Sequence, residues 1–304
     1  MSSSNAYRRG LLSAFALVIL WGLQPFFMRV ALQSFDAYSI SWARFLVSVI
    51  IFGTFLTFRE GKQWLTKCKP YLLHLFIAGA FLAVNYCTFL TGIKLGGALT
   101  ATILIQFGPL LLAMIGIVFF KERFSKMQIL AVCIALFGFF LFYRDRVASS
   151  TEGALQEVAA MYVIIAAITW AIFCIFQKKY TPHLGVMTFN VGIFIVCSIL
   201  LLPFIELGDF LSFEKVFSLQ FLSVIYLGLS TALAYSALGE ALRLLPASTV
   251  SLVIVTNPFV TITGVEILSL LSVTWITVTP LTQIGYIGTL LALAGVGAAT
   301  ALKK

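Results

Sequence analysis

Charged side chains are scarce in this sequence. Asp, Glu, Lys and Arg together make up 10% of the 304 residues, whereas ordinary soluble domains carry about a quarter. Hydrophobic residues reach 61%, which excludes an ordinary water-soluble globular domain. The composition predicts a protein embedded in a lipid bilayer.

Side chains that carry chemistry are also rare. The two histidines, His74 and His183, have neither a glutamate nor a second histidine at metal-ligand spacing. Four of the five cysteines fall inside apolar runs, and no two have metal-ligand or redox spacing, so we expect them to be small packing residues. No phosphate-binding loop or G-x-S-x-G motif occurs. We therefore expect no metal, no cofactor and no catalytic residue, and no enzyme.

Acidic residues are fewer than basic ones, 11 against 20, which gives a net charge of +9. This excess does not indicate nucleic-acid binding, because no basic cluster is interleaved with aromatics outside the apolar runs. If the N-terminus is cytoplasmic, 14 of the 20 Lys and Arg fall on the inner side. The positive-inside rule then predicts an inner-membrane protein with both termini in the cytoplasm.

Long apolar runs dominate what is present. Each is about 17 to 25 residues long, enough to cross a bilayer as a helix. They lack the alternation of barrel strands, so we expect ten transmembrane helices and an all-α membrane fold. The ten runs are 10–33, 39–58, 71–93, 97–120, 127–143, 156–177, 185–205, 218–242, 247–272 and 281–302.

The chain repeats itself. "LWGLQPFFMR" (20–29) returns 149 residues later as "TWAIFCIFQK" (169–178), with tryptophan and a basic residue in the same places. The same offset, without a gap, aligns Gly79 with Gly228, Tyr86 with Tyr235 and Pro109 with Pro258. Beyond this point the offset is 157, which aligns Ala135 with Ala292 and Gly138 with Gly295. We predict two repeats, residues 1–147 and 148–304.

Each repeat holds five predicted helices, an odd number, so the second copy must enter the membrane from the opposite side. Inverted five-helix repeats are typical of secondary transporters, whose substrate site lies near the membrane midplane between the halves. Pro25 and Gln24 lie at this depth in the first span. A proline there frees a backbone carbonyl, which must face protein or a wet cavity.

Four aromatic residues form two pairs related by the repeat: Trp21 with Trp170, and Tyr86 with Tyr235. Lipid-facing Trp and Tyr prefer the membrane interfaces, so aromatics at mid-depth favour a cavity. The alternative is that they only pack between the repeats. We predict that they bind substrate together with Gln24.

Polar residues mark the fourth and ninth spans. Thr102, Gln106 and Pro109 share one helix face at positions i, i+4 and i+7, and Ser251 and Asn257 echo them in the second repeat. We predict substrate contacts for Gln106, Ser251 and Asn257. The alternative is that these side chains bond their own backbone.

Two charged residues lie inside predicted spans. Glu266 falls about 9 Å from the outer end of the ninth span, and Arg44 about 7 Å from that of the second. Because buried charges in membranes are costly, we predict that the two share a cavity and handle charge or coupling. Alternatively, Arg44 snorkels to the surface and Glu266 is satisfied structurally. For Glu240, an interfacial pair with Arg243 at i+3 is the simpler account.

Three segments resemble the EamA family of the drug/metabolite transporter superfamily: "LWGLQPFFMRVAL" (20–32), "ARFLVSVII" (43–51) and residues 85–142, with Pro109 and "KERFSKMQ" (121–128). The likeness covers nearly the whole chain. One departure is Leu271, which stands where the repeat would place the counterpart of Glu122. The resemblance implies a ten-helix carrier for small organic metabolites, often amino acids moved outward.

We therefore expect a secondary transporter of an amino acid or related zwitterion, working by alternating access in the lipid bilayer. One alternative imports or exchanges a nucleotide-derived cofactor or nucleotide sugar. A membrane-embedded enzyme and a scaffold are the rivals from other classes, and the enzyme would need a nucleophile or metal set that the spans lack. Small-residue stripes in the fifth and tenth spans leave a homodimer open.

Overall fold

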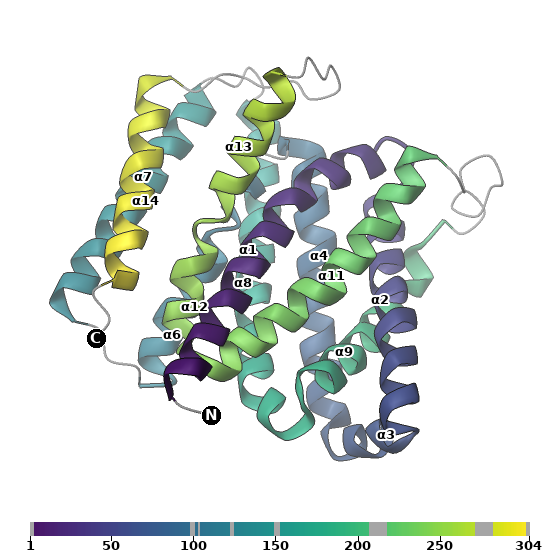
Figure 1. The fold of residues 1–304 in the computed structure, drawn as a ribbon. Coiled ribbons are helices and arrows are strands. Elements are labelled where there is room, and N and C mark those ends of the chain that lie inside the picture. The colour runs from purple at the N-terminus through teal and green to yellow at the C-terminus, as the bar shows by residue number, and fades with distance from the viewer. Residues whose placement is uncertain are drawn as a thin grey trace.

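The structure of the chain is a computed structural model. It describes residues 3–97, 101–102, 104–121, 125–148, 153–206, 218–270 and 282–301, which are helical almost throughout and contain no strand (Figure 1). The predicted all-α class is confirmed. The helices are α1 (Ser3–Ala31), α2 (Ala37–Glu60), α3 (Gln63–Cys68), η1 (Lys69–Tyr71), α4 (Leu72–Gly96), α6 (Phe107–Val118), α7 (Lys126–Ala148), α8 (Gly153–Leu184), α9 (Val186–Leu201), η2 (Leu202–Phe204), α11 (Leu219–Leu244), α12 (Ala247–Ile254), α13 (Asn257–Leu270) and α14 (Gln283–Ala301).

Six helical segments in the described part are long and apolar enough to cross a membrane by length and composition. They coincide with the first three predicted runs and with the sixth, seventh and eighth. Shorter apolar helices cover parts of the other four runs: Phe107–Val118, Lys126–Phe142, Ala247–Thr261 and Gln283–Ala292. The hydropathy of the sequence therefore finds the apolar helices that the described residues contain.

Capping residues and glycines set several helix ends. Asp36 caps α2, because its carboxylate accepts hydrogen bonds from the backbone N–H groups of Tyr38 (2.7 Å) and Ser39 (3.0 Å). Gly97 follows α4 with φ +80°, and Gly185 separates α8 from α9 with φ +83°. These backbone angles suit glycine, so the chain turns sharply at both places.

The fourth and ninth apolar runs, each predicted as one helix, are interrupted. Residues Ile105 and Gln106 form a turn before α6, and Val255 and Thr256 form a turn between α12 and α13. Pro109 and Pro258 then stand in the first turn of the helix that follows. Proline is tolerated there, since its missing N–H would have no helical partner, but it would disrupt a continuous helix.

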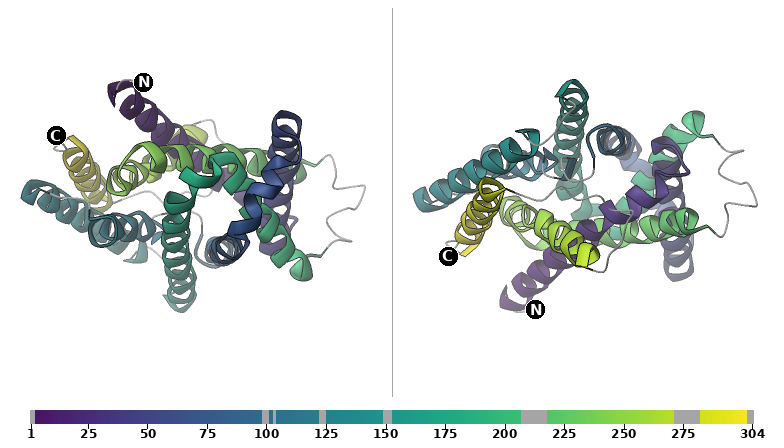
Figure 2. Two further views of the ribbon diagram at one scale, coloured as in Figure 1. Left: turned by 90° about the horizontal axis from the view of Figure 1, so that it is seen from below. Right: turned by 90° about the horizontal axis from the view of Figure 1, so that it is seen from above.

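The helices pack in pairs that join the two halves of the chain. α1 runs along α11, α4 along α8 and α7 along α14, while α2 lies against α9. Views from both ends show α7 and α14 together at one edge of the bundle (Figure 2). Glycines allow this last contact, because a Cβ built on Gly138 would lie only 2.3 Å from the backbone nitrogen of Ala292.

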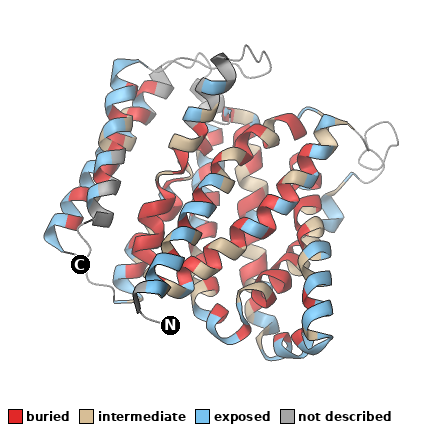
Figure 3. Cartoon of the chain, in the orientation of Figure 1, coloured by how far each residue is buried: buried red, intermediate tan, exposed pale blue. Residues whose placement is uncertain are grey.

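Burial follows the packing. Residues on the inward helix faces are buried, and the outward faces are exposed (Figure 3). Many exposed residues are large and apolar, for example Phe58 (87% exposed) and Val118 (71%). Such a surface suits lipid, not water. Against this background the buried polar residues stand out, and several of them line one cavity.

Candidate functional site

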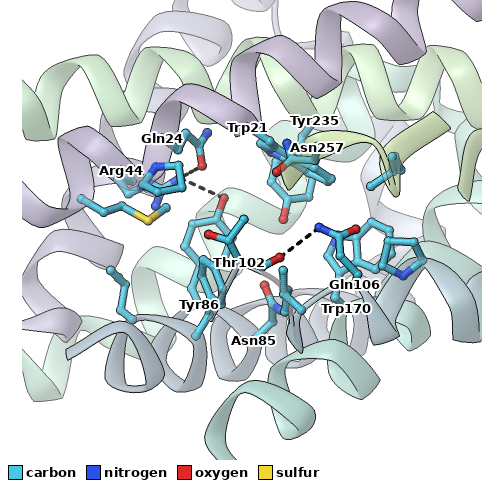
Figure 4. A pocket seen from close by; sticks show the side chains of 17 residues that line it. Trp21, Gln24, Arg44, Asn85, Tyr86, Thr102, Gln106, Trp170, Tyr235 and Asn257 are labelled. Atoms are coloured by element: carbon cyan, nitrogen blue, oxygen red, sulfur yellow. Dashed lines mark hydrogen bonds between the residues drawn. The ribbon is translucent and has the colours of Figure 1, made fainter. Parts of the chain in front are cut away.

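A cavity lies inside the bundle. It lies between α1, α2, α4, α8 and α11, and the two interrupted runs complete its wall. The cavity is closer to the C-terminal ends of α1 and α4 than to their beginnings. Eight predicted site residues are among the 17 that line it (Figure 4): Trp21, Gln24, Arg44, Tyr86, Gln106, Trp170, Tyr235 and Asn257. That they bind a substrate stays a prediction.

The four predicted aromatic residues converge on this cavity from four different helices. The ring centroid of Trp21 lies 5.8 Å from that of Trp170 and 5.7 Å from that of Tyr235, with the planes 72° and 67° apart. Tyr86 lies 6.2 Å from Tyr235. Edge-to-face contacts of this kind are favourable. The indole Nε1 of Trp170 is buried without a hydrogen-bond partner.

Arg44 is fully buried at the cavity wall, so the alternative of a snorkelling arginine is wrong. Its Nε and Nη2 donate to the Thr231 hydroxyl at 3.0 and 2.9 Å. The guanidinium carbon lies 4.6 Å from the ring centroid of Tyr86. The third nitrogen, Nη1, has no partner. A guanidinium is charged at all relevant pH values, so the cavity carries a permanent positive charge.

Gln24 connects three helices. Its Oε1 accepts from Arg44 Nη2 at 2.8 Å (Figure 4). Its Nε2 donates to the hydroxyl of Ser230 at 3.0 Å. The bonds tie α1 to α2 and to α11. The next residue, Pro25, also lines the cavity and has no N–H to offer the carbonyl of Trp21.

Three more amide side chains line the cavity. Asn257 donates to the backbone oxygen of Val18 at 3.1 Å, and Asn85 donates to that of Ala166 at 2.7 Å. Gln106 donates to the backbone oxygen of Thr102 at 3.1 Å, while its own Oε1 is buried without a partner. Asn85 was missed by the sequence reasoning, although an amide beside Tyr86 in an apolar run is a visible signal.

Two predicted site residues do not join the described cavity wall. Ser251 is buried, and its hydroxyl donates to the backbone oxygen of Ala247 at 2.8 Å, which is the alternative that sequence left open. Glu266 belongs to α13, but its side chain lies outside the described residues. Its pairing with Arg44 therefore stays a prediction.

Glu240 forms the interfacial pair that its spacing indicates. Its carboxylate lies 2.8 Å from Arg243 Nη2 and 2.9 Å from Arg9 Nε. Both arginines are well exposed, so the pair lies at one end of the bundle and away from the cavity.

A second group of polar side chains lies between α8, α9 and α11. Gln177 Nε2 donates to Asn190 Oδ1 at 3.0 Å and to the backbone oxygen of Tyr235 at 3.2 Å. Four atoms of this group are buried without partners: Gln177 Oε1, Asn190 Nδ2, Thr181 Oγ1 and Ser236 Oγ. We call these four residues the inner cluster. Sequence reasoning missed it, although Gln177 and Thr181 at i and i+4 in an apolar helix were a signal.

The described residues contain no group of three His, Cys, Asp or Glu side chains that could hold a metal ion. The five cysteines are free thiols.

The EamA-like transporter family matches the chain twice, over residues 8–144 and 158–300. A protein named as an uncharacterized transporter from Haemophilus influenzae is 24% identical over 283 residues, covering 92% of each chain. The uncharacterized inner membrane transporter YhbE of Escherichia coli is 25% identical over 289 residues, covering 94% of this chain and 89% of its own. A solved crystal structure shares the fold at a TM-score of 0.73 and 15% identity, covering 98% and 97% of the two chains. The resemblance in the sequence is confirmed, and this chain, a membrane transporter, belongs to the EamA-like transporter family.

Proposed function

We propose that the chain is a secondary active transporter that moves a small organic metabolite across the inner membrane, most simply an amino acid or related zwitterion moved outward. The observation that carries this proposal is the cavity itself. An aromatic and polar cavity inside an otherwise apolar bundle, bounded by two interrupted helices, is the expected form of a carrier's central site. Neither feature has a purpose in a scaffold.

The contacts between helices support two repeats related by a twofold axis. Ser48 Oγ donates to the backbone oxygen of Gly228 at 2.9 Å, and Cys197 Sγ donates to that of Gly79 at 3.2 Å. Both members of the second contact lie 149 residues from their counterparts in the first. A contact made by one half is thus made again by the other with the roles exchanged.

The glycine contacts follow the same exchange. A Cβ on Gly79 would meet Val196 at 2.6 Å, and one on Gly228 would meet Val47 at 2.6 Å. Five helices in each repeat, 1–147 and 148–304, then require opposite insertion. α1 begins and α14 ends at the same end of the bundle (Figure 1), which is consistent with both termini in the cytoplasm.

In this proposal the repeats rock around the cavity. We call the contacting rings of Trp21, Trp170 and Tyr235 the floor of the cavity. The inner cluster adjoins this floor, because the backbone oxygen of Tyr235 accepts a hydrogen bond from Gln177 Nε2. Unpartnered buried polar atoms are costly unless water or a ligand reaches them. We propose that the inner cluster lines a water-filled pathway from the cavity to the cytoplasm when the floor opens.

Charge handling is assigned to Arg44 and Glu266, and Ser251 stays a proposed substrate contact, although it does not line the described cavity wall. The alternative substrate class, a nucleotide-derived cofactor or nucleotide sugar, would bring two phosphate charges. Arg44 is the one Lys or Arg among the described residues that line the cavity, so this alternative has less support.

The test is ligand-dependent thermal stabilisation of the purified protein. Amino acids, purines, nucleotide cofactors and quaternary amines are screened, because a ligand at a hundred times its Kd stabilises the folded state by about 2.7 kcal/mol. We expect an amino acid to raise the melting temperature of the wild type and of Trp64→Ala, which lies outside the cavity, but not of Trp21→Ala. A compound that stabilises all three proteins equally would contradict the proposed site.

A further inference from the structure

Arg44 is held by neutral groups alone in the described part of the chain. Its partners are the hydroxyl of Thr231, the amide oxygen of Gln24 and, at 3.5 Å, the hydroxyl of Tyr86. The ion pairs among the described residues do not include Arg44. The side chain is nonetheless fully buried.

A buried cation without a counter-ion is unfavourable, because neutral acceptors replace only part of its hydration. Arg44 also keeps Nη1 unpartnered beside Nη2, which donates to Gln24 Oε1 and to the Thr231 hydroxyl. These two nitrogens form the fork that binds both oxygens of a carboxylate. Gln24 Oε1, at 2.8 Å from Nη2, marks where one carboxylate oxygen would lie.

The rest of the cavity suits an apolar body. Trp21, Trp170 and Phe89 offer aromatic faces, and Met28 and Leu90 offer aliphatic surface. The described lining residues include no Asp or Glu that would pair with a substrate ammonium group.

From this arrangement we infer that the substrate is a small carboxylate with an apolar body: its carboxylate displaces the Gln24 amide and binds Nη1 and Nη2 of Arg44, and its body lies against Trp21 and Trp170. This inference deepens the proposed function and rests on it. It makes the carboxylate, and not the amino group of an amino acid, the feature that the cavity selects.

The test compares acids with their neutral or cationic amides. The probes are phenylacetate with phenylacetamide, and L-leucine with L-leucinamide. Binding is followed by quenching of tryptophan fluorescence, since Trp21 and Trp170 line the cavity. Hydrogen bonds to a charged group predict that each acid binds about tenfold or more tightly than its amide.

Three variants locate the preference. Arg44→Met should bind acid and amide equally, and Arg44→Lys should retain part of the preference, because it keeps the charge but loses the fork. Arg59→Met makes the same chemical change at an exposed arginine of the same helix and should behave as the wild type. If Arg44→Met does not fold, Thr231→Val, which removes two of the arginine's bonds, should weaken acids more than amides.

Equal binding of acids and amides by the wild type would overturn the inference, as would an acid preference that survives in Arg44→Met. Failure of every acid to bind would overturn it too. The proposed function is tested separately by uptake into proteoliposomes. Acids that bind but are not transported would contradict the proposed transport function but not the carboxylate site. Transport of an amide would support the transport function and contradict selection of the carboxylate.

Discussion

Replacing Gly138 by alanine should destabilise the contact between α7 and α14. The added Cβ would lie 2.3 Å from the backbone nitrogen of Ala292 and 2.6 Å from the backbone oxygen of Gly288. Backbone atoms cannot swing aside as a flexible side chain can. To bring the first distance to the 3.4 Å of ordinary contact, the helices must separate by about 1 Å, and overpacking of this kind costs about 1 to 3 kcal/mol.

Gly53→Ala is the matched control. The nearest atom to its added Cβ would be a methyl group of Val191 at 3.7 Å, so alanine fits and should add about 0.5 to 1 kcal/mol through helix propensity. Thermal unfolding in detergent should therefore give a lower Tm for Gly138→Ala and an unchanged or higher Tm for Gly53→Ala. Gly295→Ala, whose Cβ would meet the nitrogen of Ala135 at 2.5 Å, should match Gly138→Ala. Equal melting of Gly138→Ala and Gly53→Ala would refute the packing argument.

Two further outcomes follow from single contacts. Asp36→Ala removes the cap of α2 and its two hydrogen bonds to backbone N–H groups, so the free energy of unfolding should fall by about 1 kcal/mol in chemical denaturation. Asp36→Asn should keep most of this stabilisation, because asparagine is also a good cap. Thr181→Cys, in a background without native cysteines, should react with an impermeant maleimide in inside-out vesicles. The reaction should be faster when a transported compound is present. Reaction only in right-side-out vesicles would reverse the proposed orientation of the inner cluster.

The helices could be predicted because long apolar runs have one stable form in lipid. Hydropathy did not reveal the turn at Val255 and Thr256, since both sides of it are equally apolar. The position of Pro258 was the available signal: a proline belongs in the first turn of a helix, so a break must precede it.

The repeat explains why much of the site could be predicted. Aromatics at matched positions near mid-depth, such as Trp21 and Trp170, contact each other at the cavity, which residues from both halves of the chain line. Ser251 does not line the described cavity wall, and its hydroxyl donates to the backbone oxygen four residues earlier. The partner of Arg44 could not be predicted, since Thr231 is 187 residues away and neither residue's neighbours indicate the pairing.

The central claim is that substrate crosses the membrane through the cavity between the two repeats. Counterflow into proteoliposomes tests it most directly, with each compound that stabilises the purified protein offered on both sides in the wild type, Trp21→Ala and Trp64→Ala. The account predicts labelled uptake by the wild type and Trp64→Ala and its loss in Trp21→Ala, with all three proteins folded. Uptake that survives in Trp21→Ala at the wild-type rate and affinity would contradict it.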